Sequence, residues 1–226
     1  MSDDRIPVGG GPPTVGGDGV ADSAESWPVR HAGTAFSGRV VSVRTDEVVP
    51  PGGGPPFVRD VVVHPGAVAV LALDDAGDVL VVHQYRHPVG HRLYEIVAGL
   101  LDVPGEDPLD AAARELAEEA HLVAADWRVL VDFFTSPGMT TESIRVYLAR
   151  GVRAAPGPVY AGVDEEADMP TSWVALDELV AGVLAGRLHN PTLLAGVLAA
   201  HAARTGAGFD ALRPAAAPWP ARRPLP

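Results

Sequence analysis

Three glutamates, Glu115, Glu118 and Glu119, lie three and four residues apart near the middle of the chain. On an α-helix such residues share one face, so their carboxylates repel each other unless a cation lies between them. Carboxylate oxygens favour Mg²⁺, Mn²⁺ or Ca²⁺ over zinc, and the chain has no cysteine that would favour a softer metal. The spacing therefore predicts a divalent-metal site. The alternative is a solvated helix face on which Arg114 screens the glutamates through ion pairs.

A helix over 108–121 would position these glutamates. Asp107 is a good N-cap, and Pro108 falls at the first helical position. Apolar residues follow at the three-four spacing of a buried stripe, namely Leu109, Ala112, Ala113, Leu116, Ala117 and Ala120. We therefore expect the carboxylates to point away from the core.

The segment 99–122 resembles the Nudix signature, Gly-x5-Glu-x7-Arg-Glu-U-x-Glu-Glu-x-Gly-U, in which U is a bulky aliphatic residue. The matching residues are Gly99, Glu106, Arg114, Glu115, Leu116, Glu118, Glu119 and Leu122. Two positions depart from the pattern: six residues rather than five separate Gly99 from Glu106, and His121 stands in place of a glycine. Histidine enters the left-handed backbone conformation more readily than most residues, and neither departure touches the acidic cluster.

The resemblance implies an enzyme that hydrolyses a nucleoside diphosphate linked to another moiety and depends on Mg²⁺ or Mn²⁺. Such a metal lowers the pKa of bound water and offsets charge on the phosphoryl oxygens. By resemblance, Glu115 and Glu119 are the principal metal ligands, Glu118 is a further ligand, and the backbone carbonyl of Ala98 completes the shell. Arg114 is counted among the catalytic residues, and we expect it to orient the glutamates rather than to touch substrate.

A second motif narrows the substrate. Ser-Pro-Gly-Met-Thr-Thr-Glu at 136–142 resembles a loop of ADP-ribose pyrophosphatases, with Pro137 sixteen positions after His121. Upstream, 84–88 and 95–99 resemble the same subgroup, although Val97 stands where proline is usual. The resemblance implies that Arg86 contacts a phosphate, that Glu142 contacts the terminal ribose region, and that Gly138, Met139 and, more weakly, Arg59 also bind substrate.

The catalytic base is expected outside the Nudix signature. The acidic segment 163–169 resembles a mobile loop that carries a glutamate base in ADP-ribose pyrophosphatases. A loop of this kind closes over bound substrate. The resemblance favours Glu165 as the base, with Glu166 as the alternative.

The order of the predicted strands and helices indicates an α/β (α+β) fold. The resemblance specifies an α/β/α sandwich around a mixed sheet, with a small amino-terminal antiparallel sheet. Runs 67–73 and 79–85 are expected to form a hairpin around 74–78. The other predicted strands are 39–49, 57–64, 127–134, 144–149 and 171–176, and the predicted helices are 108–121, 177–186 and 191–205.

The chain of 226 residues, 47% of them hydrophobic, suits one main domain with additions. Residues 65–205 form the expected Nudix domain, and 34–64 form the amino-terminal sheet, which the resemblance assigns to dimerisation and substrate contacts. Segments 1–33 and 206–226 are predicted to be disordered because they are rich in glycine, proline or alanine. Trp27, Phe36 and Phe57 remain open candidates for stacking on adenine.

The formal net charge of −12 disfavours nucleic acid and anionic membrane as partners. A small nucleotide remains compatible, because bound metal and a few arginines neutralise its phosphates. No apolar run resembling a signal peptide occurs in residues 1–25, and the chain has no cysteine for disulfides, so we expect a cytoplasmic protein.

Three functions follow from the sequence. The favoured one is hydrolysis of ADP-ribose to AMP and ribose 5-phosphate by a homodimer that exchanges its amino-terminal sheets, as the resemblance implies. The second is hydrolysis of another nucleoside diphosphate sugar, since the metal ligands would be the same. The third is a non-catalytic module that binds ADP-ribose, against which the intact glutamates argue.

Overall fold

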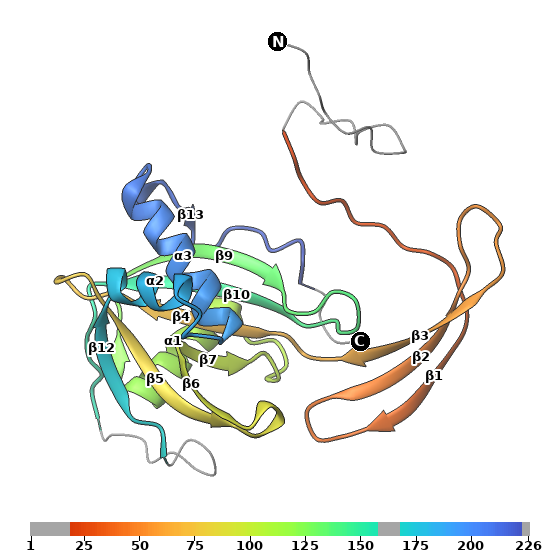
Figure 1. Cartoon of the computed structure of the whole chain (residues 1–226), viewed down its shortest axis with the longest axis horizontal. Helices are drawn as coiled ribbons and strands as arrows, with labels where there is room; N and C mark the ends of the chain where they lie inside the picture. The colour runs from red at the N-terminus through yellow and green to blue at the C-terminus, as the bar shows by residue number, and fades with distance from the viewer. Residues whose placement is uncertain (1–18, 158–167, 223–226) are drawn as a thin grey trace.

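The computed structural model describes residues 19–157 and 168–222. Its centre is a five-stranded mixed sheet with the order β13-β9-β10-β4-β7 (Figure 1). These strands are β4 (Ala67–Ala72), β7 (Val97–Leu100), β9 (Asp126–Phe134), β10 (Ser143–Arg150) and β13 (Arg213–Pro214). Strands β4 and β10 run parallel and the other neighbours are antiparallel, which confirms the predicted mixed sheet.

Helices cover both faces of this sheet. Along β4, Val68 and Val70 join one buried cluster with α1 (Pro108–Ala120), whereas Ala69 and Leu71 join another with α2 (Leu176–Leu184) and α3 (Pro191–Thr205). The alternation follows from the two-residue repeat of a strand that is buried on both faces. The predicted α/β/α sandwich is therefore confirmed. No helix in the described part of the chain is long and apolar enough to cross a membrane.

A second sheet has the order β12-β5-β6 and comprises β5 (Asp78–Arg86), β6 (His91–Glu95) and β12 (Thr171–Ala175), with a 3₁₀ turn, η1 (His87–Val89), between β5 and β6. The predicted hairpin between 67–73 and 79–85 is wrong. Leu73 and Val79 form a single bridge, and β4 then pairs with β7 and β10 while β5 pairs with β6 and β12. Strand β4 is buried on both faces, so it lies inside the central sheet rather than at a hairpin edge.

The amino-terminal sheet has three antiparallel strands, β1 (Val29–Ser37), β2 (Ser42–Val48) and β3 (Phe57–Val63). Figure 1 shows it projecting from the body of the molecule. Strand β1 was not predicted, and the expected tail boundary at residue 33 falls inside it. Its side chains are almost all exposed, so they carry no alternating apolar pattern. The part of that predicted tail at 1–18 lies outside the described residues.

The carboxyl-terminal segment differs from the predicted disordered tail over 206–226. Its described part contains a 3₁₀ turn, η3 (Phe209–Ala211), and β13, which pairs with β9. The buried Arg145 of β10 donates to the carbonyls of Ala217 at 2.8 Å and Pro218 at 3.0 Å. The segment is held by contacts to residues about 70 positions away, which local composition does not reveal. Two short strands, β8 (Leu122–Val123) and β11 (Arg153–Ala154), pair beside α1.

Candidate active site

Helix α1 has the ends that its sequence predicts. The Asp107 carboxylate accepts a hydrogen bond from the Leu109 N–H at 2.8 Å, and Pro108 takes the first helical position. At the other end, His121 adopts the left-handed conformation with φ 53° and ψ 39°. It is the one non-glycine residue with positive φ in the described ranges. The helix therefore stops directly after its glutamates, at the position where the Nudix pattern has glycine.

Arg114 gathers three carboxylates around its guanidinium. It donates to both oxygens of Glu106 at 3.0 and 3.1 Å, to Glu115 at 2.7 Å and to Glu118 at 3.1 Å. The hydrogen bond from Arg114 holds the pKa of Glu106 below its usual value near 4.5. The hydrogen bond to Glu106 likewise raises the pKa of Arg114. These contacts hold Glu106, Glu115 and Glu118 around one guanidinium.

The glutamates lie directly over strand β7. A side chain at Gly99 would place its Cβ 2.1 Å from the carboxyl carbon of Glu115, so Glu115 occupies space that only glycine leaves open. The N–H of Ala98 faces Glu119, with 3.4 Å between the nitrogen and Oε2. Pairing of β7 with β4, through Val68 and Gly99, fixes this part of the chain in the central sheet. The structure thus brings Ala98, Glu115 and Glu119 to the interface of β7 and α1.

The chemistry of these donors fits a hard divalent cation, because they comprise three carboxylates and a nearby backbone carbonyl. In the described residues, however, no group of three or more His, Cys, Asp and Glu side chains is arranged to enclose a metal ion. Glu115 and Glu118 are turned toward Arg114, which already supplies positive charge between them. A metal would therefore share or replace the contacts that these carboxylates make with Arg114.

Arg86 is held by Glu95 across strands β5 and β6. Its guanidinium donates to both oxygens of Glu95 at 2.9 and 2.7 Å. Glu95 is 2% exposed, whereas the Arg86 side chain is 40% exposed and accessible to a ligand. Glu95 precedes Ala98 by three residues, so the two positions are within about 10 Å along the chain. Sequence reasoning missed this role of Glu95, because the pair depends on how β5 and β6 align.

Glu142 lies at the end of the 136–142 loop. Its carboxylate accepts a hydrogen bond from the Thr135 hydroxyl at 2.6 Å and lies 3.6 Å from Nε2 of His64. The loop and the segment that follows β3 therefore meet at Glu142. This places the predicted ribose contact where the amino-terminal sheet joins the Nudix domain.

Gly138 and Met139 are exposed in the same loop. The carbonyl of Met139 accepts from the N–H of Val62 at 2.8 Å, which docks the loop on β3. The third predicted contact, Arg59, also lies on β3, where its guanidinium stacks 4.3 Å from the centre of the Phe57 ring. Its described contacts are within the amino-terminal sheet, and none joins it to α1.

The proposed bases, Glu165 and Glu166, lie outside the described residues. Asp168, where the described chain resumes, forms an ion pair of 2.5 Å with Arg92 of β6. A second hydrogen bond joins Arg92 to the Asp168 carbonyl at 3.0 Å. Arg92 was not predicted, because its partner is 76 residues away in sequence. It attaches the end of the acidic segment to the sheet that carries Arg86.

Comparison with known proteins shows the family to which the chain belongs. Residues 63–194, which include β4, β7 and α1, match the NUDIX domain family. The chain is 48% identical over 187 residues to the ADP-ribose pyrophosphatase of Mycobacterium tuberculosis (strain ATCC 25618 / H37Rv), covering 82% of this chain and 87% of that protein. It is 37% identical over 156 residues to the methanol dehydrogenase activator of Bacillus methanolicus, covering 69% and 82% of the two chains.

A solved structure of an ADP compounds hydrolase has the same fold. It aligns with a TM-score of 0.69 over 83% of this chain and 99% of its own, at 19% sequence identity. The family match spans more than half of the chain, and a relative at 48% identity covers most of it. The protein therefore belongs to the Nudix hydrolase family.

Proposed function

We propose that this Nudix hydrolase cleaves the pyrophosphate bond of ADP-ribose to give AMP and ribose 5-phosphate, with Mg²⁺ or Mn²⁺ as its cofactor. The observation that carries the proposal is the packing of Glu115 across Gly99, with Glu119 beside Ala98. It collects the α1 carboxylates at one edge of the central sheet. The 48% identity to an ADP-ribose pyrophosphatase supports the choice of substrate.

Glu115, Glu119, Glu118 and the Ala98 carbonyl are the groups that would hold the metal. When bound, a divalent ion acidifies a coordinated water and offsets charge on the phosphoryl oxygens. Arg114 donates to Glu115 and Glu118, and its positive charge lowers the repulsion between them. Glu106 in turn fixes Arg114 through two hydrogen bonds.

Arg86 is the proposed phosphate contact, and Glu95 holds its guanidinium in place. An arginine held by a buried carboxylate loses less side-chain freedom when it binds a phosphate. Glu142, with Gly138 and Met139 beside it, is the proposed contact for the terminal ribose, and Arg59 is a further candidate. Glu165 is the proposed base that takes a proton from the attacking water, with Glu166 as the alternative.

The amino-terminal sheet supports a homodimer. Several large apolar side chains on or beside it are at least 40% exposed: Trp27, Val29, Phe36, Val40 and Val58. Exposed apolar residues gathered on one small sheet are typical of a protein interface. We propose that a second copy of this chain covers this sheet.

Product analysis tests the proposed reaction. Purified full-length protein is incubated with ADP-ribose, GDP-mannose, UDP-glucose or NADH, each with Mg²⁺, with Mn²⁺ and with a chelator. We expect AMP and ribose 5-phosphate from ADP-ribose, at a rate that the chelator abolishes. Preference for another substrate would keep the reaction class and contradict the substrate assignment.

A substitution of one proposed ligand tests the metal assignment. Glu115→Gln should lose turnover by at least about 100-fold, because one anionic ligand is removed while the side chain keeps its size. Asp75→Asn, in an exposed turn, is the matched control for loss of one negative charge. Unchanged activity of the Glu115 variant would contradict the metal assignment.

A further inference from the structure

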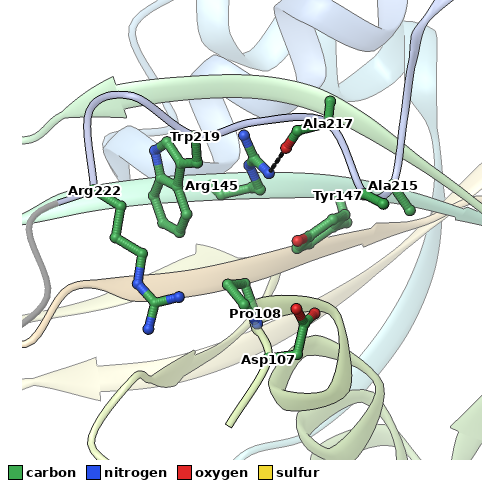
Figure 2. Close-up of a pocket in the computed structure, with 9 residues that line it drawn as sticks. Asp107, Pro108, Arg145, Tyr147, Ala215, Ala217, Trp219 and Arg222 are labelled. Atoms are coloured by element: carbon green, nitrogen blue, oxygen red, sulfur yellow. Dashed lines mark hydrogen bonds between the residues drawn. The ribbon is translucent and has the colours of Figure 1, made fainter. Parts of the chain in front are cut away.

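A cavity of about 330 Å³ lies between the start of α1, strand β10 and the carboxyl-terminal segment. Its lining includes Asp107, Pro108, Arg145, Tyr147, Trp219 and Arg222. Figure 2 shows the Tyr147 hydroxyl and the Arg222 guanidinium on opposite sides of this gap, with the Trp219 ring above and Pro108 below. The size falls within the range of small-molecule sites.

This cavity is separate from the proposed active site. It lies at the first residues of α1, whereas Glu115 and Glu119 follow two to three turns later. At 1.5 Å per residue, the rise from Asp107 is about 12 Å to Glu115 and about 18 Å to Glu119. The Nudix signature assigns no role to the cavity. Trp219 and Arg222 lie outside residues 63–194, the part of the chain that matches the NUDIX domain family.

One wall of the cavity is formed by Arg145, whose charge is paired with the carboxylate of Asp132. Arg145 is 3% exposed and is fixed by two hydrogen bonds to Asp132, at 2.7 and 2.9 Å, and by the carbonyls of Ala217 and Pro218. Its guanidinium stacks 4.9 Å from the centre of the Trp219 ring. The same contacts hold the carboxyl-terminal segment over the cavity, so the wall is already formed before any ligand binds.

Two buried side-chain nitrogens at this cavity have no hydrogen-bond partner among the described residues, and both are donors. Nε of Arg222 and Nε1 of Trp219 are buried and have no hydrogen-bond acceptor in the described structure. Arg222 forms no ion pair with a carboxylate of the described residues. The Asp107 carboxylate caps α1 through one oxygen and also lies beside Tyr147 at the edge of the cavity. Burial raises the pKa of Tyr147, and its hydroxyl, which already accepts a hydrogen bond from Arg145, still has its proton to donate. Buried donors without acceptors are costly, and an anionic ligand in the gap would offer acceptors to Arg222.

We propose that this cavity binds a phosphate group, either as free phosphate or as a small phosphate monoester. Arg222 and Tyr147 face the gap from opposite sides, which requires acceptors that point in several directions. A tetrahedral phosphate presents such acceptors, whereas a carboxylate presents both oxygens on one side. The remaining volume accommodates a sugar-sized substituent against Trp219. This site is independent of the proposed ADP-ribose hydrolysis.

The indole N–H signals of the four tryptophans provide a direct readout by ¹⁵N NMR of the full-length protein. Trp219→Phe identifies the Trp219 signal. The protein is held in chelator and titrated with ribose 5-phosphate, inorganic phosphate, ribose or acetate. We expect the Trp219 signal to shift and saturate near or below about 1 mM with one or both phosphates. Ribose and acetate should bind at least about tenfold more weakly. The two phosphate titrations show whether the free ion or the ester is preferred.

Variants separate this site from general charge effects. Arg222→Gln should weaken phosphate binding by about tenfold or more, because a charged donor is lost. Tyr147→Phe removes the opposing donor at constant shape and should weaken it severalfold. Arg153→Gln, an exposed arginine of β11, is the matched control and should bind as the wild type does. Absence of a Trp219 shift, equal binding of acetate, or unchanged affinity in both cavity variants would overturn the proposal, whether or not the protein hydrolyses ADP-ribose.

Discussion

Gly99 illustrates how the absence of a side chain positions a carboxylate. Its hydrogen atoms leave the space in which the Glu115 carboxyl group lies against β7. In Gly99→Ala, the new methyl group would meet that carboxyl carbon at 2.1 Å, so Glu115 must move. Because a displacement of about 1 Å in a catalytic group can cost about 100-fold, we expect kcat to fall by about that factor. Steady-state kinetics with ADP-ribose measures it.

A second glycine separates this effect from a general cost of adding a methyl group. Gly52 lies in the exposed loop between β2 and β3, and a Cβ there would have nothing within 4 Å. Gly52→Ala should leave kcat unchanged. Equal kcat values for the two variants and the wild type would show that Glu115 need not lie over Gly99.

Glu106 is expected to make stability depend on pH. Its pKa is lower in the folded protein than in the unfolded chain, because Arg114 bonds to the ionised form. The stabilisation is therefore present above the usual pKa near 4.5 and is lost as pH falls through the lowered value. Glu106→Gln should reduce the free energy of unfolding by about 1 kcal/mol at pH 7.

Denaturant unfolding of both proteins at several pH values tests this expectation. The difference between wild type and Glu106→Gln should shrink as pH falls below 4.5 and disappear below the lowered pKa of the folded state, where Glu106 is protonated in both states. Asp75→Asn should show no such trend, because Asp75 is exposed and has no arginine partner in the described structure. A difference that stays constant down to pH 3 would contradict a role for the Glu106 charge.

Helix α1 ends at a residue that is poorly suited to its backbone conformation. His121 has φ 53°, and left-handed backbone costs a residue with a Cβ about 1 kcal/mol relative to glycine. His121→Gly should therefore raise the free energy of unfolding by about 0.5–1 kcal/mol. Thermal and denaturant unfolding measure the change. His121→Ala is the matched comparison and should not stabilise; an equal gain in both variants would mean that backbone strain is not the cause.

The elements that could be predicted are those with a local signal. Helix α1 has a cap, a proline at its first turn and a regular apolar stripe, so its bounds were predicted to within one residue. The expectation that its carboxylates point away from the core is wrong for Glu115 and Glu119, which lie against β7. The prediction of a hairpin between 67–73 and 79–85 was wrong. Two apolar runs on either side of a turn have the same sequence pattern whether they pair with each other or with other strands. The pairing partners of β4 come from residues 97–100 and 144–149, which no local pattern specifies.

The candidate site likewise contains residues that local spacing groups together and residues that only the folded chain brings together. Glu115, Glu118 and Glu119 lie on one helix, so spacing alone groups them. Arg86 with Glu95 depends on the register of two strands, and Arg92 with Asp168 joins residues far apart in sequence. These pairs become visible only when the strands are placed. Cross-strand and long-range charge pairs are therefore the part of the site that sequence reasoning misses.

At the scale of the whole molecule, the Nudix domain and the amino-terminal sheet meet at a few hydrogen bonds between β3 and the 136–142 loop. Val62 bonds to Met139 and Thr141, and the Thr141 hydroxyl accepts from the N–H of His64 at 3.0 Å. Glu142 follows directly in the chain. Movement of the sheet would therefore reach the proposed ribose contact, so whatever covers the sheet also bears on the active site.

The proposed cover is a second copy of the chain, and light scattering coupled to size-exclusion chromatography tests it. We expect wild-type protein to have about twice the chain mass of 23.5 kDa. Val58 is 58% exposed on β3, and Val58→Asp should shift the population toward monomer, because burying an unpaired charge in an interface is costly. Leu184→Asp, at a residue that is 77% exposed at the end of α2, is the matched control and should leave the mass unchanged. A wild-type monomer at all concentrations would contradict the dimer. If Val58→Asp and Leu184→Asp kept the same dimeric mass, the interface would lie away from Val58.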